Sequence, residues 1–281
     1  MKKPAISFIA LFSVLLIALV GAGCLNPTAN SENIVASGST TVLPLMQNLS
    51  EIYHAKNTDV IVIVKGGGSG TGIAELVDKT NDIAMSSREI KQEEINDAKA
   101  NGITPQEYII AYDGITVVVH PLNPVNSLTL DQLQKIYSGE ITNWQEVGGN
   151  DATIAVISRD SASGTQEYFQ EAVMKDKDFR SDMITQSATG AVTQEVSQNE
   201  KAIGFIGTAY QSSSVKSLGI DVDGTVIYPT DETILSGKYP ISRALYLYVP
   251  SNHSQAVQDF INYILSPEGQ QIVKDVGYVP I

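Results

Sequence analysis

Short apolar runs that alternate with helix-like segments constrain the fold of this chain more than any other feature. The runs are "VIVIV" (60–64), "ITVVV" (115–119), "TIAVI" (153–157), "AIGFI" (202–206) and "ALYLYV" (244–249). They are almost purely apolar and rich in β-branched residues, the pattern of strands that are buried on both faces. Strands that alternate with helices predict an α/β fold with largely parallel strand pairing.

Two of the intervening helices carry clear boundary signals. Thr129 can cap a helix with a regular apolar face, and Gly139 can end it. Near the C-terminus, Ser266-Pro267 is typical of an N-cap followed by a proline in the first helical turn.

The N-terminal segment predicts export and lipidation. Lys2 and Lys3 precede an apolar run (6–20), and small residues then lead to Cys24, the only cysteine. The run is too short for a comfortable membrane span and is typical of a secretory signal, here residues 1–23. A cysteine at this place suggests a lipobox, with Cys24 acylated and residues 24–33 as a polar tether. The alternative is ordinary cleavage nearby with an incidental thiol.

Length and charge exclude some function classes. The 281 residues are enough for one large domain or two lobes, and the formal net charge of −13 makes nucleic acid an unexpected partner. The acidity does not exclude an anionic ligand, because a local site can oppose the overall charge. A lone cysteine also excludes an intrachain disulfide.

Two junctions between a predicted strand and a predicted helix share a Ser-Gly-Thr sequence. In "VKGGGSGTGIAEL" (64–76) the loop contains Ser69, and in "ISRDSASGTQEYF" (157–169) it contains Arg159, Ser163, Gly164 and Thr165. Loops that lead into helices expose unpaired N–H groups at a positive helix end, where an anion can bind. Arginine adds permanently charged donors suited to phosphate or carboxylate.

Two further junctions have the same arrangement. Ser39, Thr40 and Thr41 follow an apolar start, and "DIAMSSRE" (82–89) ends in hydroxyl residues and an arginine. Each junction alone could be a glycine turn, an N-cap or a surface ion pair. Four such junctions together predict helix N-termini that converge on one small, dehydrated oxyanion.

Signals for catalysis are poor. A P-loop needs lysine after Gly72, where Ile73 stands, and neither the dinucleotide-binding nor the nucleophile-elbow pattern fits the glycine-rich loop. The histidines, His54, His120 and His253, lack metal-ligand spacing. We therefore expect no catalytic residue, no metal and no cofactor.

At this point the chain resembles the substrate-binding lipoproteins of phosphate ABC transporters, in the shorter branch of that family. The resemblance covers nearly all of the chain after the signal. It rests on the ordered series "ASGSTTV", "GGGSGTGI", "DIAMSSRE", "IYSGEITNW", "SRDSASGTQEYF", "AIGFIG", "YPISRALYLYV" and "LSPEGQQIVKDVGYVP".

The resemblance implies a type II periplasmic-binding-protein fold, in which two α/β lobes joined by two hinge crossovers close over phosphate. It implies that the ligand contacts are Ser39, Thr40, Thr41, Ser69, Ser87, Arg159, Ser163, Gly164 and Thr165. It also implies an extracytoplasmic protein, held at the membrane by its lipid, that delivers phosphate to the permease subunits. A monomer is expected.

One position departs from the family pattern. Longer relatives have an aspartate that accepts the proton of hydrogen phosphate where this chain has Ser87. A carboxylate there repels sulfate, which carries no proton near neutral pH, whereas a hydroxyl can donate or accept. Asp160 is a candidate for the missing acceptor, and Arg88 is a candidate for a further ligand contact.

The expected lobe boundaries place residues 34–117 and 242–281 in lobe I and residues 118–241 in lobe II. The extended segments 115–121 and 239–249 are the expected crossovers. Three other functions compete with phosphate binding: the same fold binding sulfate, molybdate or tungstate, a phosphatase or other hydrolase, and an adhesin or phosphate sensor.

Overall fold

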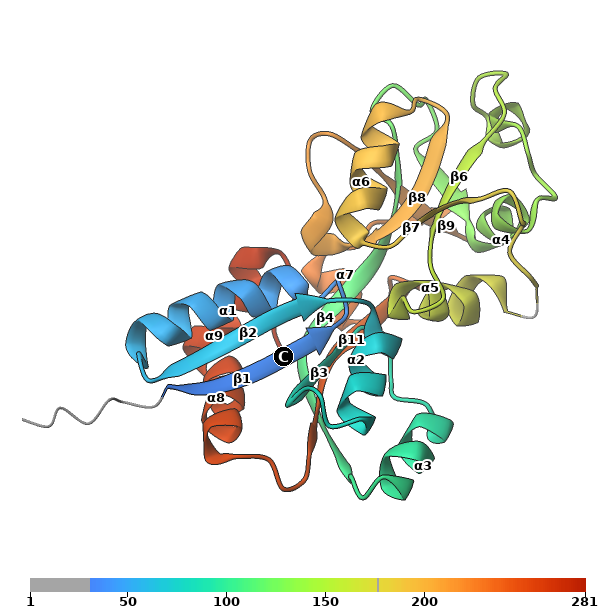
Figure 1. Ribbon diagram of the computed structural model, residues 1–281. Coiled ribbons are helices and arrows are strands. Elements are labelled where there is room, and N and C mark those ends of the chain that lie inside the picture. The colour runs from blue at the N-terminus through green and yellow to red at the C-terminus, as the bar shows by residue number, and fades with distance from the viewer. Residues whose placement is uncertain (1–30, 176) are drawn as a thin grey trace, which may run out of the picture. The chain divides into compact units, whose positions relative to one another are not determined.

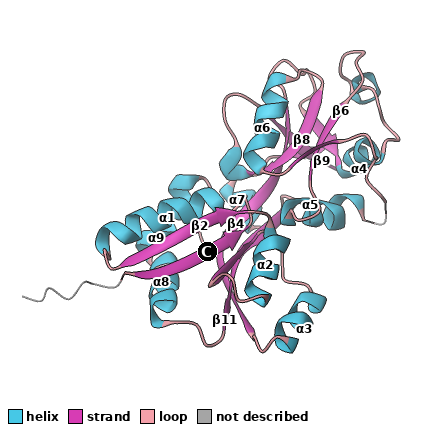
Figure 2. Cartoon of the chain, in the orientation of Figure 1, coloured by secondary structure: helices cyan, strands magenta, loops and turns pink. Residues whose placement is uncertain are grey.

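The structure is a computed structural model that describes residues 31–175 and 177–281. The predicted signal peptide, the Cys24 lipidation site and most of the tether lie outside the described residues. The strands, drawn in magenta in Figure 2, are β1 (Glu32–Gly38), β2 (Val60–Gly66), β3 (Ile83–Ser86), β4 (Pro105–Val119), β5 (Ser127–Thr129), β6 (Ala155–Arg159), β7 (Ile184–Gln186), β8 (Ala202–Gly207), β9 (Lys216–Val222), β10 (Thr225–Ile227) and β11 (Ser242–Pro250).

The α-helices, drawn in cyan in Figure 2, are α1 (Leu43–Lys56), α2 (Ser69–Val77), α3 (Gln92–Ala100), α4 (Leu130–Ser138), α5 (Gly164–Phe169), α6 (Thr189–Gln198), α7 (Asp231–Leu235), α8 (Gln255–Leu265) and α9 (Pro267–Val276). A π-helical turn, Gln170–Met174, continues α5, and Trp144–Val147 and Thr208–Tyr210 form short 3-10 turns.

The strands form one sheet in the order β2-β1-β3-β11-β4-β8-β6-β7, with β9 joining β4 to β5 and β10. The pairs β1–β2, β1–β3, β6–β8, β6–β7 and β5–β9 are parallel, as expected. The expectation of largely parallel pairing is nevertheless wrong for the centre of the sheet. There β11 runs antiparallel to β3 and β4, and β4 runs antiparallel to β8 and β9.

The antiparallel centre arises because two long strands cross the sheet in opposite directions. β4 and β11 pair along Pro105–Gly114 and Ser242–Pro250, with a register shift between Leu245 and Tyr246. In Figure 1, β4 runs from one group of helices to the other, whereas β11 starts between the groups and pairs with only the first part of β4, Pro105–Gly114. Alternating strands and helices predicted parallel neighbours, but a strand that returns from a second structural unit has no such constraint.

Each half of the sheet has its own hydrophobic cores. We call residues 31–111 and 245–278 half I and residues 115–241 half II, because the buried residues of two cores belong to each half. The exception is Val279, which packs into a core of half II and bridges to Tyr112. The buried side chains pass from a core of one half to a core of the other at the middle of β4 and at the start of β11.

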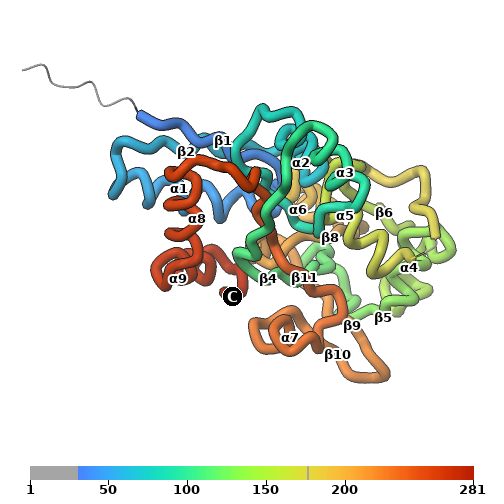
Figure 3. Tube along the Cα trace, turned by 90° about the horizontal axis from the view of Figure 1, so that it is seen from below, coloured from blue at the N-terminus to red at the C-terminus, as the bar shows by residue number. Residues whose placement is uncertain are grey.

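Helices cover both faces of each half. In half I, α1, α8 and α9 lie together on one face, as Figure 3 shows, and α2 with α3 lies on the other. In half II, α6 packs on β4, β6 and β8, while α4 and the π-helical turn belong to the opposite core. Most of the predicted apolar runs are therefore buried on both faces. The expectation is wrong for β2, an edge strand on which Ile61 and Ile63 are each 39% exposed.

The predicted helix signals are confirmed. The Thr129 hydroxyl accepts from the Gln132 N–H, and Gly139 ends α4 in the left-handed conformation. Ser266 caps α9, with Pro267 in its first turn. The strand predicted at 153–157 begins two residues later and runs through Arg159, because Thr153 instead bridges to Asn143. Within the described ranges, no helix has the length and apolar character of a membrane span.

Candidate functional site

The four predicted junctions lie at strand ends, as the sequence indicated. β1, β2 and β3 are parallel neighbours, so their carboxyl ends meet at one edge of half I. The loops that follow lead to α1, α2 and α3. The fourth loop lies in half II between β6 and α5, and its Ser163 caps α5. Parallel sheets place ligand sites at this edge.

Hydroxyl groups from both halves meet between these loops. The Oγ1 atoms of Thr41 and Thr165 are 2.9 Å apart, and those of Thr40 and Thr189 are 3.1 Å apart. In half I, the Oγ atoms of Ser69 and Ser87 are 3.3 Å apart. We call the set the hydroxyl cluster, and each of its residues is at most 6% exposed: Thr40, Thr41, Ser69, Ser87, Thr165 and Thr189.

Ser39 and Ser163 have local roles beside the cluster. The Ser39 Oγ accepts from the Thr41 and Val42 N–H groups, and the Ser163 Oγ accepts from the Gln166 N–H. Each serine therefore shapes its loop while its own proton remains free to be donated. By helix geometry, the N–H groups of Gly164 and Thr165 at the start of α5 have no intrahelical partner.

Arg159 lies at the end of β6, 2% exposed, and donates only to neutral oxygens. Its Nε and Nη2 bond to the carbonyls of Gln186 and Ser187, each at 3.0 Å, and its Nη1 bonds to the Thr189 hydroxyl at 2.9 Å. Among the described residues, no carboxylate lies within 4.0 Å of its guanidinium. The Arg159 side chain is therefore enclosed by protein and is not exposed in an open cleft.

The pKa of Arg159 is lowered by its burial. Burial lowers it to about 10, the negative charge of Asp160 opposes this in part, and the positive charge of Arg243 lowers it further. Desolvation disfavours the charged form of a base, and a nearby anion would reverse the effect. Arg159 is thus a buried cation whose charge is not compensated by an ion pair.

Arg88, the other candidate arginine, differs. Its guanidinium makes a double hydrogen bond with Glu94, at 2.7 and 2.8 Å, and an ion pair with Glu167 of half II. Burial alone would lower the pKa of Arg88, but the hydrogen bonds and charges of Glu94 and Glu167 outweigh it, so the pKa is raised. Arg88 is compensated, and its role in the structure is to hold the halves together.

Asp160, the candidate proton acceptor, follows Arg159 but is absent from the network of the hydroxyl cluster. One of its oxygens, Oδ1, is buried without a hydrogen-bond partner in the structure. The carboxylate that does lie beside the cluster is Asp113 of β4, which is fully buried. Nothing in the described chain groups three or more His, Cys, Asp or Glu residues as metal ligands.

The glycines allow the two halves to touch. The Gly70 N–H donates to the Ala162 carbonyl across the halves at 3.1 Å. A Cβ on Gly164 would lie 2.3 Å from the Ser69 Oγ, and a Cβ on Gly68 would lie 2.4 Å from the Ala162 oxygen. Only glycine fits this approach, which brings the two Ser-Gly-Thr loops face to face.

Sequence reasoning missed three residues beside the site. Thr189 follows β7 and is the first residue of α6, so "SATGAV" (187–192) repeats the strand, hydroxyl, glycine and helix pattern and could have been recognised. Arg243 and Asp113 are opposite each other on β11 and β4, and their carboxylate and guanidinium pair at 2.8 Å. No local signal identifies this pair, because the register between the two strands creates it.

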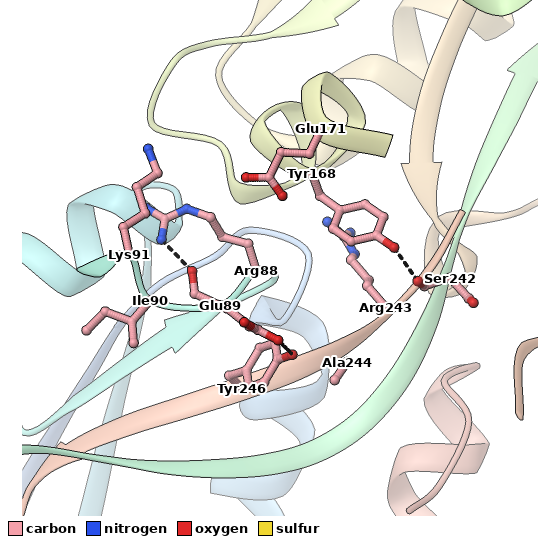
Figure 4. A pocket seen from close by; sticks show the side chains of 10 residues that line it. All are labelled: Arg88, Glu89, Ile90, Lys91, Tyr168, Glu171, Ser242, Arg243, Ala244 and Tyr246. Carbon is pink, nitrogen blue, oxygen red and sulfur yellow. Dashed lines mark hydrogen bonds between the residues drawn. The ribbon is translucent and has the colours of Figure 1, made fainter. Parts of the chain in front are cut away.

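A cavity of about 480 Å³ lies next to the hydroxyl cluster rather than at it. Figure 4 shows Arg88, Glu89 and Lys91 on one side of it and Tyr168, Glu171 and Arg243 on the other. Arg243 lines the cavity and also donates to Thr165 of the cluster. A small dehydrated anion needs the convergent donors of the cluster and not this larger space, so we place the candidate site at the cluster.

Comparison with known proteins identifies the family of the chain. The family model of the PBP superfamily domain matches residues 26–268. The phosphate-binding protein PstS of Borreliella burgdorferi is 34% identical, over 95% of this chain and 98% of its own length. That of Staphylococcus saprophyticus is 32% identical, over 96% and 86%.

A solved structure from Clostridium perfringens, described as a phosphate ABC transporter substrate-binding protein with bound phosphate, superposes with a TM-score of 0.82. It is 37% identical, over 89% of this chain and all of that one. The architecture is therefore a type II periplasmic-binding-protein fold. The chain belongs to the PBP superfamily and, within it, to the PstS-like family of phosphate ABC transporter substrate-binding proteins.

Proposed function

We propose that this protein binds inorganic phosphate outside the cytoplasm and delivers it to the permease of an ABC transporter. The observation that carries the proposal is Arg159, a buried guanidinium with no carboxylate partner in the described structure. Its bond to Thr189 joins it to the hydroxyl cluster that both halves form. A dianion at this place would compensate the charge and accept the free hydroxyl and N–H donors.

The proposed phosphate contacts come from both halves. Half I supplies hydroxyl or N–H donors from Ser39, Thr40, Thr41, Ser69 and Ser87. Half II supplies the guanidinium of Arg159, the hydroxyls of Ser163 and Thr165, and the N–H groups that begin α5 at Gly164. We leave Arg88 out of the contact set because Glu94 and Glu167 already compensate it.

We propose further that the halves are two lobes that open and close about β4 and β11. The change of core between Ala111 and Ile115, and between Ile241 and Leu245, supports boundaries near 117 and 242. Hydrogen bonds between the halves, such as the one from the Tyr210 hydroxyl to the Thr40 carbonyl at 2.5 Å, would form on closure. Small-angle scattering with and without phosphate would measure the change.

Isothermal titration calorimetry with phosphate, sulfate and molybdate tests the ligand. We expect tight 1:1 binding of phosphate by the monomer. Preference for sulfate or molybdate over phosphate would favour the alternative oxyanion function and refute the proposed one. The same protein should not hydrolyse p-nitrophenyl phosphate, because the relatives it resembles are phosphate-binding proteins of transporters.

Selectivity against sulfate is expected to depend on residue 87. Ser87 Oγ is 3.3 Å from Ser69 Oγ within the cluster, and a hydroxyl accepts a phosphate proton without rejecting sulfate strongly. Ser87→Asp should lower sulfate affinity by about tenfold or more relative to phosphate, because an unpaired carboxylate would face the unprotonated anion. Competition of sulfate with phosphate in both proteins measures it, and an unchanged ratio would exclude Ser87 from ligand selection.

Attachment to the membrane is proposed to require Cys24, which lies outside the described residues. Cys24→Ser should move the protein from the membrane fraction to the soluble extracytoplasmic fraction, with phosphate affinity unchanged. One acyl chain anchors only marginally, so stable attachment implies at least two. Cell fractionation with an immunoblot gives the answer, and a variant that stays with the membrane would contradict lipidation at this residue.

A further inference from the structure

Arg243 occupies the crossing between the two halves. It lies on β11 directly opposite Asp113 of β4, and both side chains are at most 2% exposed. The Asp113 Oδ2 accepts from Nε and Nη2 of Arg243, at 3.1 and 2.8 Å. Asp113 Oδ1 accepts from the N–H and the hydroxyl of Thr208, at 2.9 and 3.1 Å. Both oxygens of this carboxylate are therefore occupied, and it holds the guanidinium in one orientation.

The guanidinium that Asp113 orients reaches both binding loops. Its Nη1 donates to the Ser87 carbonyl of half I at 2.9 Å, and its Nη2 donates to the Thr165 hydroxyl of half II at 3.0 Å. Nη1 also lies 3.5 Å from the Gly164 carbonyl. The ring of Tyr168, whose centre is 5.9 Å away, covers the group.

The bond to Thr165 has a chemical consequence. A hydroxyl has one proton to donate and two lone pairs that accept. Because the Thr165 oxygen accepts from Arg243, its own proton must point away from the guanidinium. In this structure, that direction leads to Thr41 Oγ1, 2.9 Å away in the hydroxyl cluster. Arg159 has the same relation to Thr189, but no carboxylate of residues 31–175 or 177–281 pairs with Arg159 and orients it.

We infer that Arg243 is a positioning residue for the anion site. Held by Asp113 at the crossing of the halves, it turns the Thr165 proton into the site and ties Ser87 and Thr165 into one closed arrangement. Arg243 itself does not contact the anion, because its donors are directed to Asp113, Ser87 and Thr165. The inference rests on the proposed function, since it assigns a role in the same binding event.

Calorimetry with inorganic phosphate on the full extracytoplasmic chain tests the role. Arg243→Met keeps the apolar stem and removes the donors, and should weaken binding by about tenfold to a hundredfold, the value of one charge-assisted hydrogen bond. Arg243→Lys should recover part of the loss, since an ammonium can reach one partner but lacks the planar fork. Arg180→Met is the matched control, because Arg180 pairs with Asp182 away from the cluster.

A double-mutant cycle separates positioning from a general structural role. If Arg243 acts through the Thr165 hydroxyl, then Arg243→Met in a Thr165→Val background should weaken binding less than about threefold further. Loss by the same factor in both backgrounds, or Arg243→Met affinity within about threefold of the parent, would overturn the inference.

Removal of one partner from a buried pair can prevent folding. In that event the phosphate affinity of the variant Asp113→Asn/Arg243→Met, which removes both charges, is measured instead. We expect it to lose the same affinity as Arg243→Met and to show the same coupling to Thr165→Val. Phosphate titration of the parent protein separates the two proposals. A parent that does not bind refutes the proposed function together with this inference, whereas a parent that binds no better than its Arg243 variants refutes the positioning role alone.

Discussion

Arg159→Ala is expected to weaken phosphate binding by about two to four orders of magnitude. A hydrogen bond to a charged group contributes roughly 1.5–3 kcal/mol, and the planar guanidinium can give two of them to one anion. At about 1.4 kcal/mol per tenfold, two such bonds give the stated range. Arg159→Lys should restore part of the affinity, because lysine keeps the charge but not the fork.

Calorimetry on both variants measures these changes, with Arg180→Ala as the control at an arginine paired to Asp182. Arg159 also bonds to the carbonyls of Gln186 and Ser187, so the melting temperature without ligand should be recorded as well. Phosphate should raise the melting temperature of the parent but not of Arg159→Ala. Affinity of the folded variant within threefold of the parent would mean that the site is elsewhere.

Gly164→Ala is expected to hinder closure of the two halves. Its Cβ would lie 2.3 Å from the Oγ and 2.8 Å from the Cβ of Ser69, which belongs to half I. Overpacking of a close contact costs about 1–3 kcal/mol. If only the closed form is destabilised by this amount, the loss of phosphate affinity is roughly fivefold to more than a hundredfold. The fold of each half by itself should be little affected by the substitution.

Gly190→Ala is the matched control, since its Cβ would meet nothing closer than the Tyr210 ring at 3.5 Å. Small-angle scattering should show that phosphate compacts the parent and Gly190→Ala but not Gly164→Ala. If Gly164→Ala binds and compacts as the parent does, the halves do not meet at these loops when the ligand is bound.

The local part of the site could be predicted from the sequence. Arg159 ends a strand, and Ser69 and Thr165 lie in the first turn of helices that follow strands. This pattern depends only on neighbouring residues. The loops then meet because the carboxyl ends of parallel strands share an edge. Thr189 has the same pattern, but the strand before it, β7, has only three residues and is too short to stand out in the sequence.

The rest depends on contacts distant in sequence. Arg243 and Asp113 are 130 residues apart, and only the register of β4 and β11 brings them together. The pairing of Arg88 with Glu167 likewise needs the two halves to be closed. Sequence periodicity predicts which residues share a face of one element, but it does not give the register between strands from different parts of the chain.

The paired strands β4 and β11 also limit the path by which the halves can separate. The backbone hydrogen bonds between them resist sliding, and the ladder is interrupted at the register shift between Leu245 and Tyr246, next to the change of core. A bulge bends and twists a strand more easily than it lets the strand translate. Separation should therefore be a rotation with one main degree of freedom. If the halves close over the ligand as proposed, an anion too large for the site would leave the rotation incomplete, and the angle between the halves would report the size of the bound anion.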